Sequence, residues 1–232
     1  MRFLSRWSAD TDVFCLQEVP DFDDGRAGKW NLEPDMSPDL YHKIKGALPG
    51  FLPSLSDAYD DGGNRLAAFV RRELRPATRS TLTVHSAIQV PAGGALYLRS
   101  SLMQSVTLSS KGREYSVYNV HGLWQRGKKD TPERVLQSRN IVDSIGGRSR
   151  AILCGDFNLD PETESIGILE KAGLRNLIAE FGIKSTRSNR YPAHKPSRFA
   201  DYVFASREIE VDGFEAVDEE VSDHLPLCLD FD

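Results

Sequence analysis

Short apolar runs alternate with polar turn signals along the chain, and this pattern predicts a mixed α/β protein. The runs at 13–16 and 151–154 are continuous and apolar, which is typical of strands buried on both faces. Residues 81–90 and 95–108 are rich in β-branched and alternating positions and flank a Pro-Ala-Gly-Gly signal, so they predict an antiparallel pair. Further strands are expected at 51–55, 65–70, 115–120, 199–205 and 209–217, and after 221–226.

Helix signals occur between several of these strands. Asp130-Thr131-Pro132-Glu133 is a helix start that Gly146-Gly147 ends, so 115–154 forms a strand–helix–strand unit with a parallel crossover. Asp160 as N-cap and Pro161 at the first helical position predict a second helix, ended by Gly173. Residues 3–7 resemble the tail of a helix. Residues 21–49 predict a long loop with a helical turn near 40–44.

Composition limits the class of protein. The length of 232 residues suits one domain, and 40% hydrophobic with 27% charged residues is ordinary for a globular chain. No apolar run approaches the length of a membrane span. Three cysteines in apolar, strand-like runs predict buried thiols in a reduced, cytoplasmic protein, and their spacing argues against a zinc site. A net charge of −5 repels nucleic acid at long range, although local patches and metal ions can reverse that effect.

Polar side chains follow the apolar runs at the points where strands are expected to end. Asp156 and Asn158 come after 151–154, and Asn119 and His121 end the run at 115–120. Residues two apart on an extended chain point to the same side, so each pair faces one space. Asp and Asn are also favoured in turns, so capping of a turn is the alternative interpretation of Asp156 and Asn158.

The same placement recurs through the rest of the chain. Glu18 follows the strand at 13–16, and the set is completed by Asp201, Asp223 and His224. Ionisable groups beside core strands carry a desolvation cost, so a recurring set indicates a functional site. Oxygen ligands suit Mg²⁺ or Mn²⁺ rather than zinc, and an Asp–His pair can orient an imidazole. No phosphate-binding loop, dinucleotide fingerprint or serine-nucleophile motif is present.

One loop is strongly basic. Residues 184–198 carry five Lys or Arg residues, a tyrosine and a histidine, and no acid. Such a loop suits a phosphate-bearing partner, with an ordinary solvated loop as the alternative. The candidate substrate-binding residues are Arg187, Arg190, Tyr191, Lys195 and Arg198.

The order of the motifs resembles the endonuclease/exonuclease/phosphatase superfamily, which includes pancreatic deoxyribonuclease, exonuclease III-type endonucleases and sphingomyelinases. The matching motifs are Leu16-Gln17-Glu18, Asn119-Val120-His121, Gly155-Asp156-Phe157-Asn158, Phe199-Ala200-Asp201-Tyr202 and Ser222-Asp223-His224. The resemblance extends from residue 13 to the C-terminus. It implies a four-layer α/β (α+β) sandwich, with two packed mixed β-sheets flanked by helices, and one such domain over residues 1–232.

The resemblance also implies a role for each residue. Glu18 would be the principal ligand of Mg²⁺ or Mn²⁺, and Asp223 a further ligand or support. Asp156 would orient or deprotonate the attacking water, with Asn158 beside it. His224 would bind the scissile phosphate and Asp201 would hold His224. His121 would lie near the phosphate and leaving group, and Asn119 is a candidate substrate contact.

The function expected from this resemblance is metal-dependent hydrolysis of a phosphodiester, with nucleic acid as the leading substrate. A phosphatase or phosphodiesterase for a small molecule or lipid headgroup is the second hypothesis, and a non-catalytic binding scaffold is the third. The sequence shows no amphipathic or aromatic-rich insertion that would hold a membrane. Stable membrane association is therefore not expected.

The chain departs from the family pattern at its start. Members open with a strand that ends in an Asn next to the metal site, whereas Met1-Arg2-Phe3-Leu4 resembles the helix after that strand. A mis-assigned start, a trimmed chain and a natural loss of the strand are the three explanations. We expect a version extended at the N-terminus to be more stable and more active, and equal melting temperature and turnover would contradict this.

Overall fold

A six-stranded mixed sheet forms the largest layer of the computed structural model, which describes residues 1–21, 37, 39–60, 63–92, 95–195 and 197–232. Its strand order is β4-β5-β6-β7-β9-β8, and only β6 and β7 run parallel. These strands are β4 (Thr78–Ala92), β5 (Ala95–Ser110), β6 (Arg113–His121), β7 (Ala151–Asp156), β8 (Arg175–Asn176) and β9 (Asp201–Ala205). The antiparallel β4–β5 pair and the parallel β6–β7 crossover confirm the sequence predictions.

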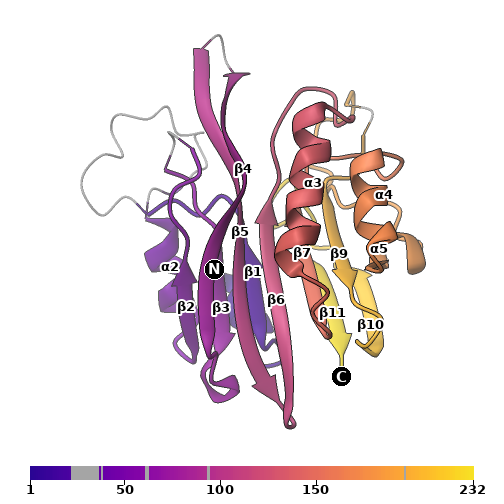
Figure 1. The fold of residues 1–232 in the computed structure, drawn as a ribbon. Helices are drawn as coiled ribbons and strands as arrows, with labels where there is room; N and C mark the ends of the chain where they lie inside the picture. The colour runs from indigo at the N-terminus through magenta and orange to yellow at the C-terminus, as the bar shows by residue number, and fades with distance from the viewer. Residues whose placement is uncertain (22–36, 38, 61–62, 93–94, 196) are drawn as a thin grey trace.

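The second layer of strands is divided into two pieces. One has the order β1-β3-β2, and the other pairs β10 with β11. The strands are β1 (Val13–Leu16), β2 (Phe51–Leu55), β3 (Ala67–Arg71), β10 (Val211–Ala216) and β11 (Leu227–Phe231). β1 and β11 are the edges of the two pieces that lie nearest to each other (Figure 1). Among the described residues, β1 pairs only with β3 and β11 only with β10, so no strand joins the pieces.

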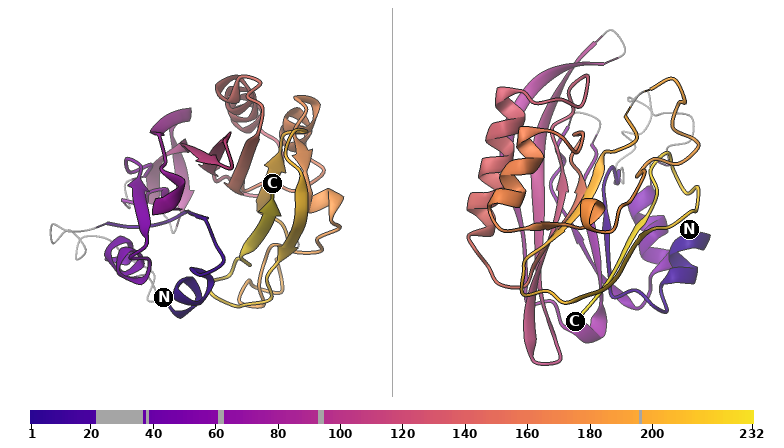
Figure 2. Two further views of the ribbon diagram at one scale, coloured as in Figure 1. Left: turned by 90° about the horizontal axis from the view of Figure 1, so that it is seen from below. Right: turned by 90° about the vertical axis from the view of Figure 1, so that its right-hand side faces the viewer.

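Helices cover the outer faces, which completes the four layers (Figure 2). α3 (Pro132–Ile145) and α4 (Glu164–Lys171) lie on the large sheet, and α1 (Arg2–Trp7) and α2 (Leu40–Ala47) lie on the three-stranded piece. Two short segments, α5 (Leu177–Glu180) and the 3-10 turn η2 (Arg72–Leu74), complete the set. None of the helices in the described ranges is long and apolar enough to cross a membrane.

Two apolar cores hold these layers together. The larger core joins Val120 and Leu153 of the large sheet to Ala68 and Phe214 of the two pieces, and it extends to the residues of α3 and α4 that face the sheet. The smaller core packs α1 and α2 on β1, β2 and β3 through residues such as Phe69. Because burial of apolar area is the main favourable term in folding, both strand layers are fixed relative to each other by the larger core.

Strand register brings three predicted site residues to one end of the large sheet. His121 pairs with Asp156 across β6–β7, and Asp156 pairs with Asp201 across β7–β9. Gly155 makes this register possible: its φ is +138°, and a Cβ at this position would lie 2.0 Å from the Val120 carbonyl oxygen. Only glycine adopts such a backbone at this close approach.

Three local predictions differ from the structure. The strand expected at 151–154, with Gly155 as its breaker, continues through Gly155 to Asp156. The helix expected from Pro161 begins at Glu164, with Thr163 as N-cap. The long loop falls largely on residues 22–36 and 38, which lie outside the described part. The turn expected at 40–44 is the longer helix α2.

Candidate active site

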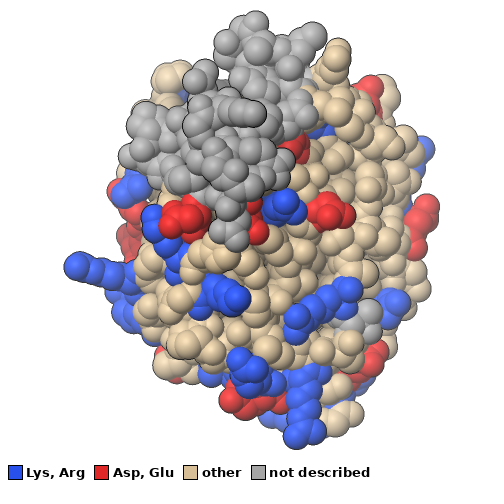
Figure 3. Space-filling view, turned by 90° about the vertical axis from the view of Figure 1, so that its left-hand side faces the viewer, with Lys and Arg blue, Asp and Glu red and all other residues tan. Residues whose placement is uncertain are grey.

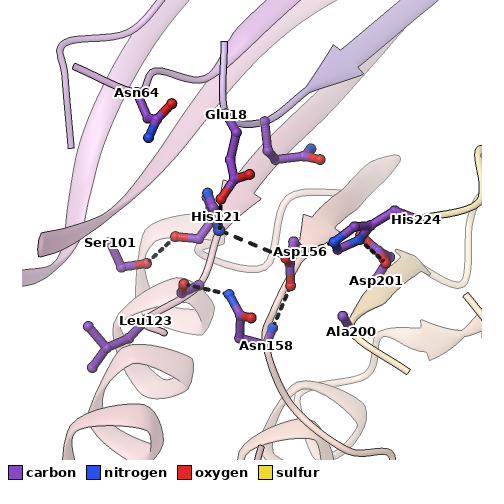
Figure 4. Close-up of polar contacts among 12 residues, drawn as sticks. Glu18, Asn64, Ser101, His121, Leu123, Asp156, Asn158, Ala200, Asp201 and His224 are labelled. Carbon is purple, nitrogen blue, oxygen red and sulfur yellow. Dashed lines mark hydrogen bonds and ion pairs between the residues drawn. The ribbon is translucent and has the colours of Figure 1, made fainter. Parts of the chain in front are cut away.

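Polar side chains from both strand layers and from the last loop converge at the end of β6, β7 and β9 (Figure 4). His121, Asp156 and Asp201 come from the large sheet, whereas Glu18 follows β1 and His224 precedes β11. Strand ends are common positions for functional groups because the regular sheet holds the backbone while loops leave the side chains accessible. The five residues were all identified from their positions at predicted strand ends.

Asp201 and His224 form the best-defined pair of the site. The Nδ1 atom of His224 lies 2.7 Å from Oδ2 of Asp201. Burial by itself lowers the pKa of His224, but the Asp201 and Asp156 carboxylates outweigh that effect and raise the pKa to about 9. His224 is therefore an imidazolium at neutral pH and presents Nε2–H toward Asp156, 3.9 Å from its Oδ2.

Asp156 is the central carboxylate. Burial and the neighbouring Asp201 charge raise its pKa to about 6. Oδ1 accepts a hydrogen bond from the Asn158 backbone N–H at 2.7 Å, and Oδ2 lies 3.8 Å from Nε2 of His121. Asn158 has a positive φ of 55°, and its side chain donates to the Gly122 carbonyl at 3.3 Å. The left-handed backbone of Asn158 turns the chain back beneath the carboxylate.

His121 is buried and held in one tautomer. Its Nδ1 lies 2.7 Å from the Tyr59 hydroxyl, and Arg99 Nη2 donates to Nε2 at 2.9 Å. Burial, together with the Arg99 charge, lowers the pKa of His121 well below its usual value. The ring is therefore neutral. Its Nδ1–H donates to the Tyr59 hydroxyl, and its Nε2 accepts from Arg99.

Glu18 enters the site from the other strand layer with a strained backbone. Its φ is 54°, which is uncommon for a residue other than glycine, and strain of this kind clusters at functional sites. Its N–H donates to the Tyr59 hydroxyl at 3.1 Å, and its Oε1 lies 3.5 Å from Arg99 Nη2 and 3.9 Å from His121 Nε2. Tyr59 thus joins Glu18 to His121.

Asn119 occupies a different place from the one predicted for it. It is fully buried, and its amide donates to the Leu16 carbonyl at 3.0 Å and accepts from Gln17 Nε2 at 2.6 Å. A side chain whose polar atoms are bonded to β1 in the interior does not face a substrate. We therefore correct the predicted substrate contact: Asn119 holds the end of β1, and with it Glu18, against β6.

The basic loop reaches the site through one arginine. Arg187 is buried, its Nη1 donates to Asp223 Oδ2 at 2.9 Å, and the same atom lies against Nε2 of His224. The Tyr191 ring contacts both Arg187 and the exposed Lys195, whereas Arg190 is exposed and Arg198 is half-buried. The structure thus brings three of the five predicted basic-loop residues into one cluster.

Four residues in or beside the site were not found from the sequence. Arg99 enters from the β4–β5 hairpin, Tyr59 from the segment after β2, and Lys128 from the segment after β6. None of them belongs to a motif at a strand end. Asn64, whose side chain lies on the Glu18 side of the site in Figure 4, was also missed.

The acids of this site could hold a divalent cation. Asp156, Asp201 and His224 each offer a ligand atom, and these atoms lie within 4.8 Å of one another. Asp156 fits a cation best, because it is buried, and burial together with the Asp201 charge raises its pKa, an effect that a bound cation would oppose. Glu18 supplies a further oxygen on the same side of His121. Asp223, the other predicted ligand, is instead paired with Arg187.

Several solved structures share this fold over nearly the whole chain. The chain is similar to an endonuclease/exonuclease/phosphatase family protein from Bacteroides thetaiotaomicron, with a TM-score of 0.72 at 20% identity over 98% of this chain and 86% of that one. It is also similar to the mannosyl-6-phosphatase Bt3783 of the same organism, with a TM-score of 0.68, 20% identity and coverages of 99% and 89%. For the human Nocturnin catalytic domain with bound sulfate the TM-score is 0.66 at 17% identity, with coverages of 99% and 84%.

The search of curated proteins found no match. The family model for the endonuclease/exonuclease/phosphatase family, in contrast, matches residues 1–224, nearly the full length of the chain. That range contains every residue of the site described above. The chain therefore belongs to the endonuclease/exonuclease/phosphatase family, a superfamily of phosphoester hydrolases.

Proposed function

We propose that this protein hydrolyses phosphodiesters with the help of Mg²⁺ or Mn²⁺, and that nucleic acid is its substrate. The observation that carries the proposal is the Asp201-held His224 imidazolium facing the buried Asp156 carboxylate across 3.9 Å. A cationic donor and a carboxylate base on opposite sides of a space this small can address one phosphate and one water molecule.

His224 and Arg187 form the anion-binding half of the site. Both are cationic donors, and Arg187 Nη1 lies against Nε2 of His224, with the Asp223 carboxylate beside the pair. Two N–H donors directed at one place repel each other until an anion accepts from both. A non-bridging oxygen of the scissile phosphate would fill this role and would gain charge-assisted hydrogen bonds from each.

Asp156 serves as the acceptor for the attacking water. Its pKa of about 6 leaves it ionised at neutral pH yet basic enough to take a proton. The Asn158 N–H fixes Oδ1 at 2.7 Å and leaves Oδ2 directed at the two imidazoles. On the opposite side, Nε2 of neutral His121 accepts a hydrogen bond from Arg99. It can accept one from the substrate only after that hydrogen bond breaks.

A divalent cation would be held by Asp156 with Glu18, for the reasons of burial and charge given above. When bound, it supplies positive charge that stabilises the oxygens on phosphorus. Asp223 would then remain the partner of Arg187. The three-way contact of Arg99 with Glu18, His121 and the Tyr59 ring keeps the acid in place before the cation arrives.

The proposal is tested by hydrolysis of bis-p-nitrophenyl phosphate and of a labelled DNA strand with Mg²⁺, with Mn²⁺ and with EDTA. His224→Gln is the test variant, and His194→Gln, an exposed histidine of the basic loop, is the matched control. We expect metal-dependent cleavage of both substrates that the first variant loses and the second keeps. Cleavage of the small diester without DNA cleavage would point to a small-molecule phosphoesterase. Equal activity in EDTA, or a fully active His224→Gln protein, would contradict the mechanism.

A further inference from the structure

Three cations surround the ring of Tyr191 beside the site. The guanidinium carbon of Arg187 lies 4.4 Å from the ring centroid, and the Nζ atoms of Lys195 and Lys128 lie 5.0 and 5.3 Å from it. Tyr191 itself is only 8% exposed. The aromatic face stabilises the cations but cannot offer itself to a nucleic-acid base, so the cations and not the ring are the groups available to a ligand.

Carboxylates compensate this cluster only in part, because Asp156, Asp160 and Asp201 attract Lys128 from beyond ion-pair distance. Asp223 pairs with Arg187 at 2.9 Å, but among the described residues no carboxylate lies within ion-pair distance of Lys128 or Lys195. Lys128 donates to the Phe199 carbonyl, which is a neutral acceptor. Lys128 is half-buried and Lys195 is exposed, so both ammonium groups are accessible to an external anion while the Tyr191 ring holds them together.

Arg187 provides a second, independent indication of a ligand. The residue is 7% exposed, and its Nε atom is buried without a hydrogen-bond partner. A buried donor left unsatisfied is costly, and a ligand that supplies the missing acceptor accounts for its presence in a native fold. The other side of the same guanidinium contacts His224, so the cluster begins where the scissile phosphate would be held.

On the face carrying α2 and β2, basic and acidic side chains alternate with uncharged ones (Figure 3). The overall charge of −5 also gives no general attraction for anions. A local cluster is therefore needed to bind a polyanionic substrate.

We propose that Lys128, Lys195 and Arg187, supported by Tyr191, form a subsite for a second phosphate of the substrate, next to the scissile one. This inference rests on the proposed function and narrows it. The preferred substrate carries a phosphate group close to the diester that is cleaved. A nucleic-acid strand has this property through its next backbone phosphate, and a small diester with an additional phosphate monoester has it as well.

The test compares a dinucleotide that bears a terminal phosphate with the same dinucleotide that lacks it. In the unmodified protein we expect the phosphorylated form to have a kcat/KM about tenfold higher, because one charge-assisted hydrogen bond strengthens binding by about this factor. In Lys195→Met and Lys128→Met the ratio of the two kcat/KM values should fall toward one. Lys184→Met, an exposed lysine of the same loop, is the matched control and should retain the ratio.

A ratio of one in the unmodified protein, or a ratio that both lysine variants preserve, would overturn the subsite. An alkyl phosphodiester with a second phosphate distinguishes a nucleic-acid strand from a small diester as the substrate. If its kcat/KM rises as much as that of the dinucleotide, the subsite recognises the phosphate alone. If only the dinucleotide shows the rise, the subsite recognises a strand. Either gain supports the subsite.

The two proposals fail in different ways. If bis-p-nitrophenyl phosphate and all dinucleotides resist hydrolysis, the proposed function is wrong. The subsite is then judged by the binding of inorganic pyrophosphate in EDTA, measured by calorimetry. Lys195→Met should weaken this binding about tenfold relative to Lys184→Met, and equal binding by the two variants would refute the subsite.

Discussion

Replacement of Asp201 by Asn tests the electrostatic logic of the site. Asp201 accepts from Nδ1 of His224 at 2.7 Å and is the main reason that the pKa of His224 rises from 6.5 to about 9 despite burial. The amide is nearly isosteric but carries no charge. Without it, burial and Arg187 oppose only the remaining influence of Asp156, so we expect the pKa of His224 to fall to its ordinary value or below.

The effect on stability follows from linkage. A pKa raised from 6.5 to about 9 corresponds to an upper bound of about 3 kcal/mol. This contribution is fully present below pH 6.5 and is lost as pH rises through 9, because His224 is then neutral in both the folded and the unfolded state. Loss of the Asp201 charge also relieves Asp156, so we expect a net destabilisation of about 1–2 kcal/mol at pH 6 that disappears or reverses near pH 10, where Asp156 is fully ionised and His224 is neutral.

Two measurements on metal-free protein check this reasoning. Proton NMR of the imidazole Cε1–H in EDTA gives the pKa of His224 directly, and urea unfolding at pH 6 and pH 10 gives the stability difference. Asp212→Asn, an exposed aspartate on β10, is the matched control for loss of one charge. An imidazole pKa that stays near 9 in Asp201→Asn, or a destabilisation equal at both pH values, would refute the assigned role of Asp201.

Three further predictions follow from the same geometry. Tyr59→Phe removes the hydroxyl that accepts from Glu18 N–H and contacts His121 Nδ1, so we expect a loss of about 1–3 kcal/mol in urea unfolding together with lower kcat; an unchanged midpoint would contradict this. Gly155→Ala places a Cβ 2.0 Å from the Val120 carbonyl, so we expect a destabilisation of more than about 3 kcal/mol or an insoluble protein, and a normal melting temperature would be evidence against the observed register. Chelation should abolish phosphodiester hydrolysis and added Mg²⁺ or Mn²⁺ should restore it, whereas full activity after dialysis against EDTA would exclude the metal-assisted mechanism.

Local sequence was sufficient for those parts of the site that strands carry. His121 and Asp156 were identified because each ends an apolar run, and strand register alone then places them side by side. Arg99 could not be identified in this way. It lies on a long hairpin strand, and only the folding of that hairpin over Tyr59 directs its guanidinium at His121 and Glu18.

The start of α4 shows the same limit within the fold. Asp160 and Pro161 form a typical local signal for a helix start, yet the helix begins at Glu164. The Asp130 carboxylate accepts from the backbone N–H groups of Glu164 and Ser165 at 2.7 and 3.0 Å. A cap supplied by a residue more than thirty positions upstream fixes the boundary, and no pattern within the helix itself reveals it.

The two histidines of the site have similar neighbours but opposite electrostatics. Each contacts an arginine that also pairs with an acid: Arg99 with Glu18 beside His121, and Arg187 with Asp223 beside His224. Only His224 has a buried carboxylate on Nδ1, whereas His121 has the Tyr59 hydroxyl in that position. A carboxylate stabilises the imidazolium and a hydroxyl does not, so His224 is charged and donates while His121 is neutral and accepts. Asp201 behind His224, and burial with the Arg99 charge around His121, thus divide the site into an anion-binding half and a half where a cation can lie between the acids.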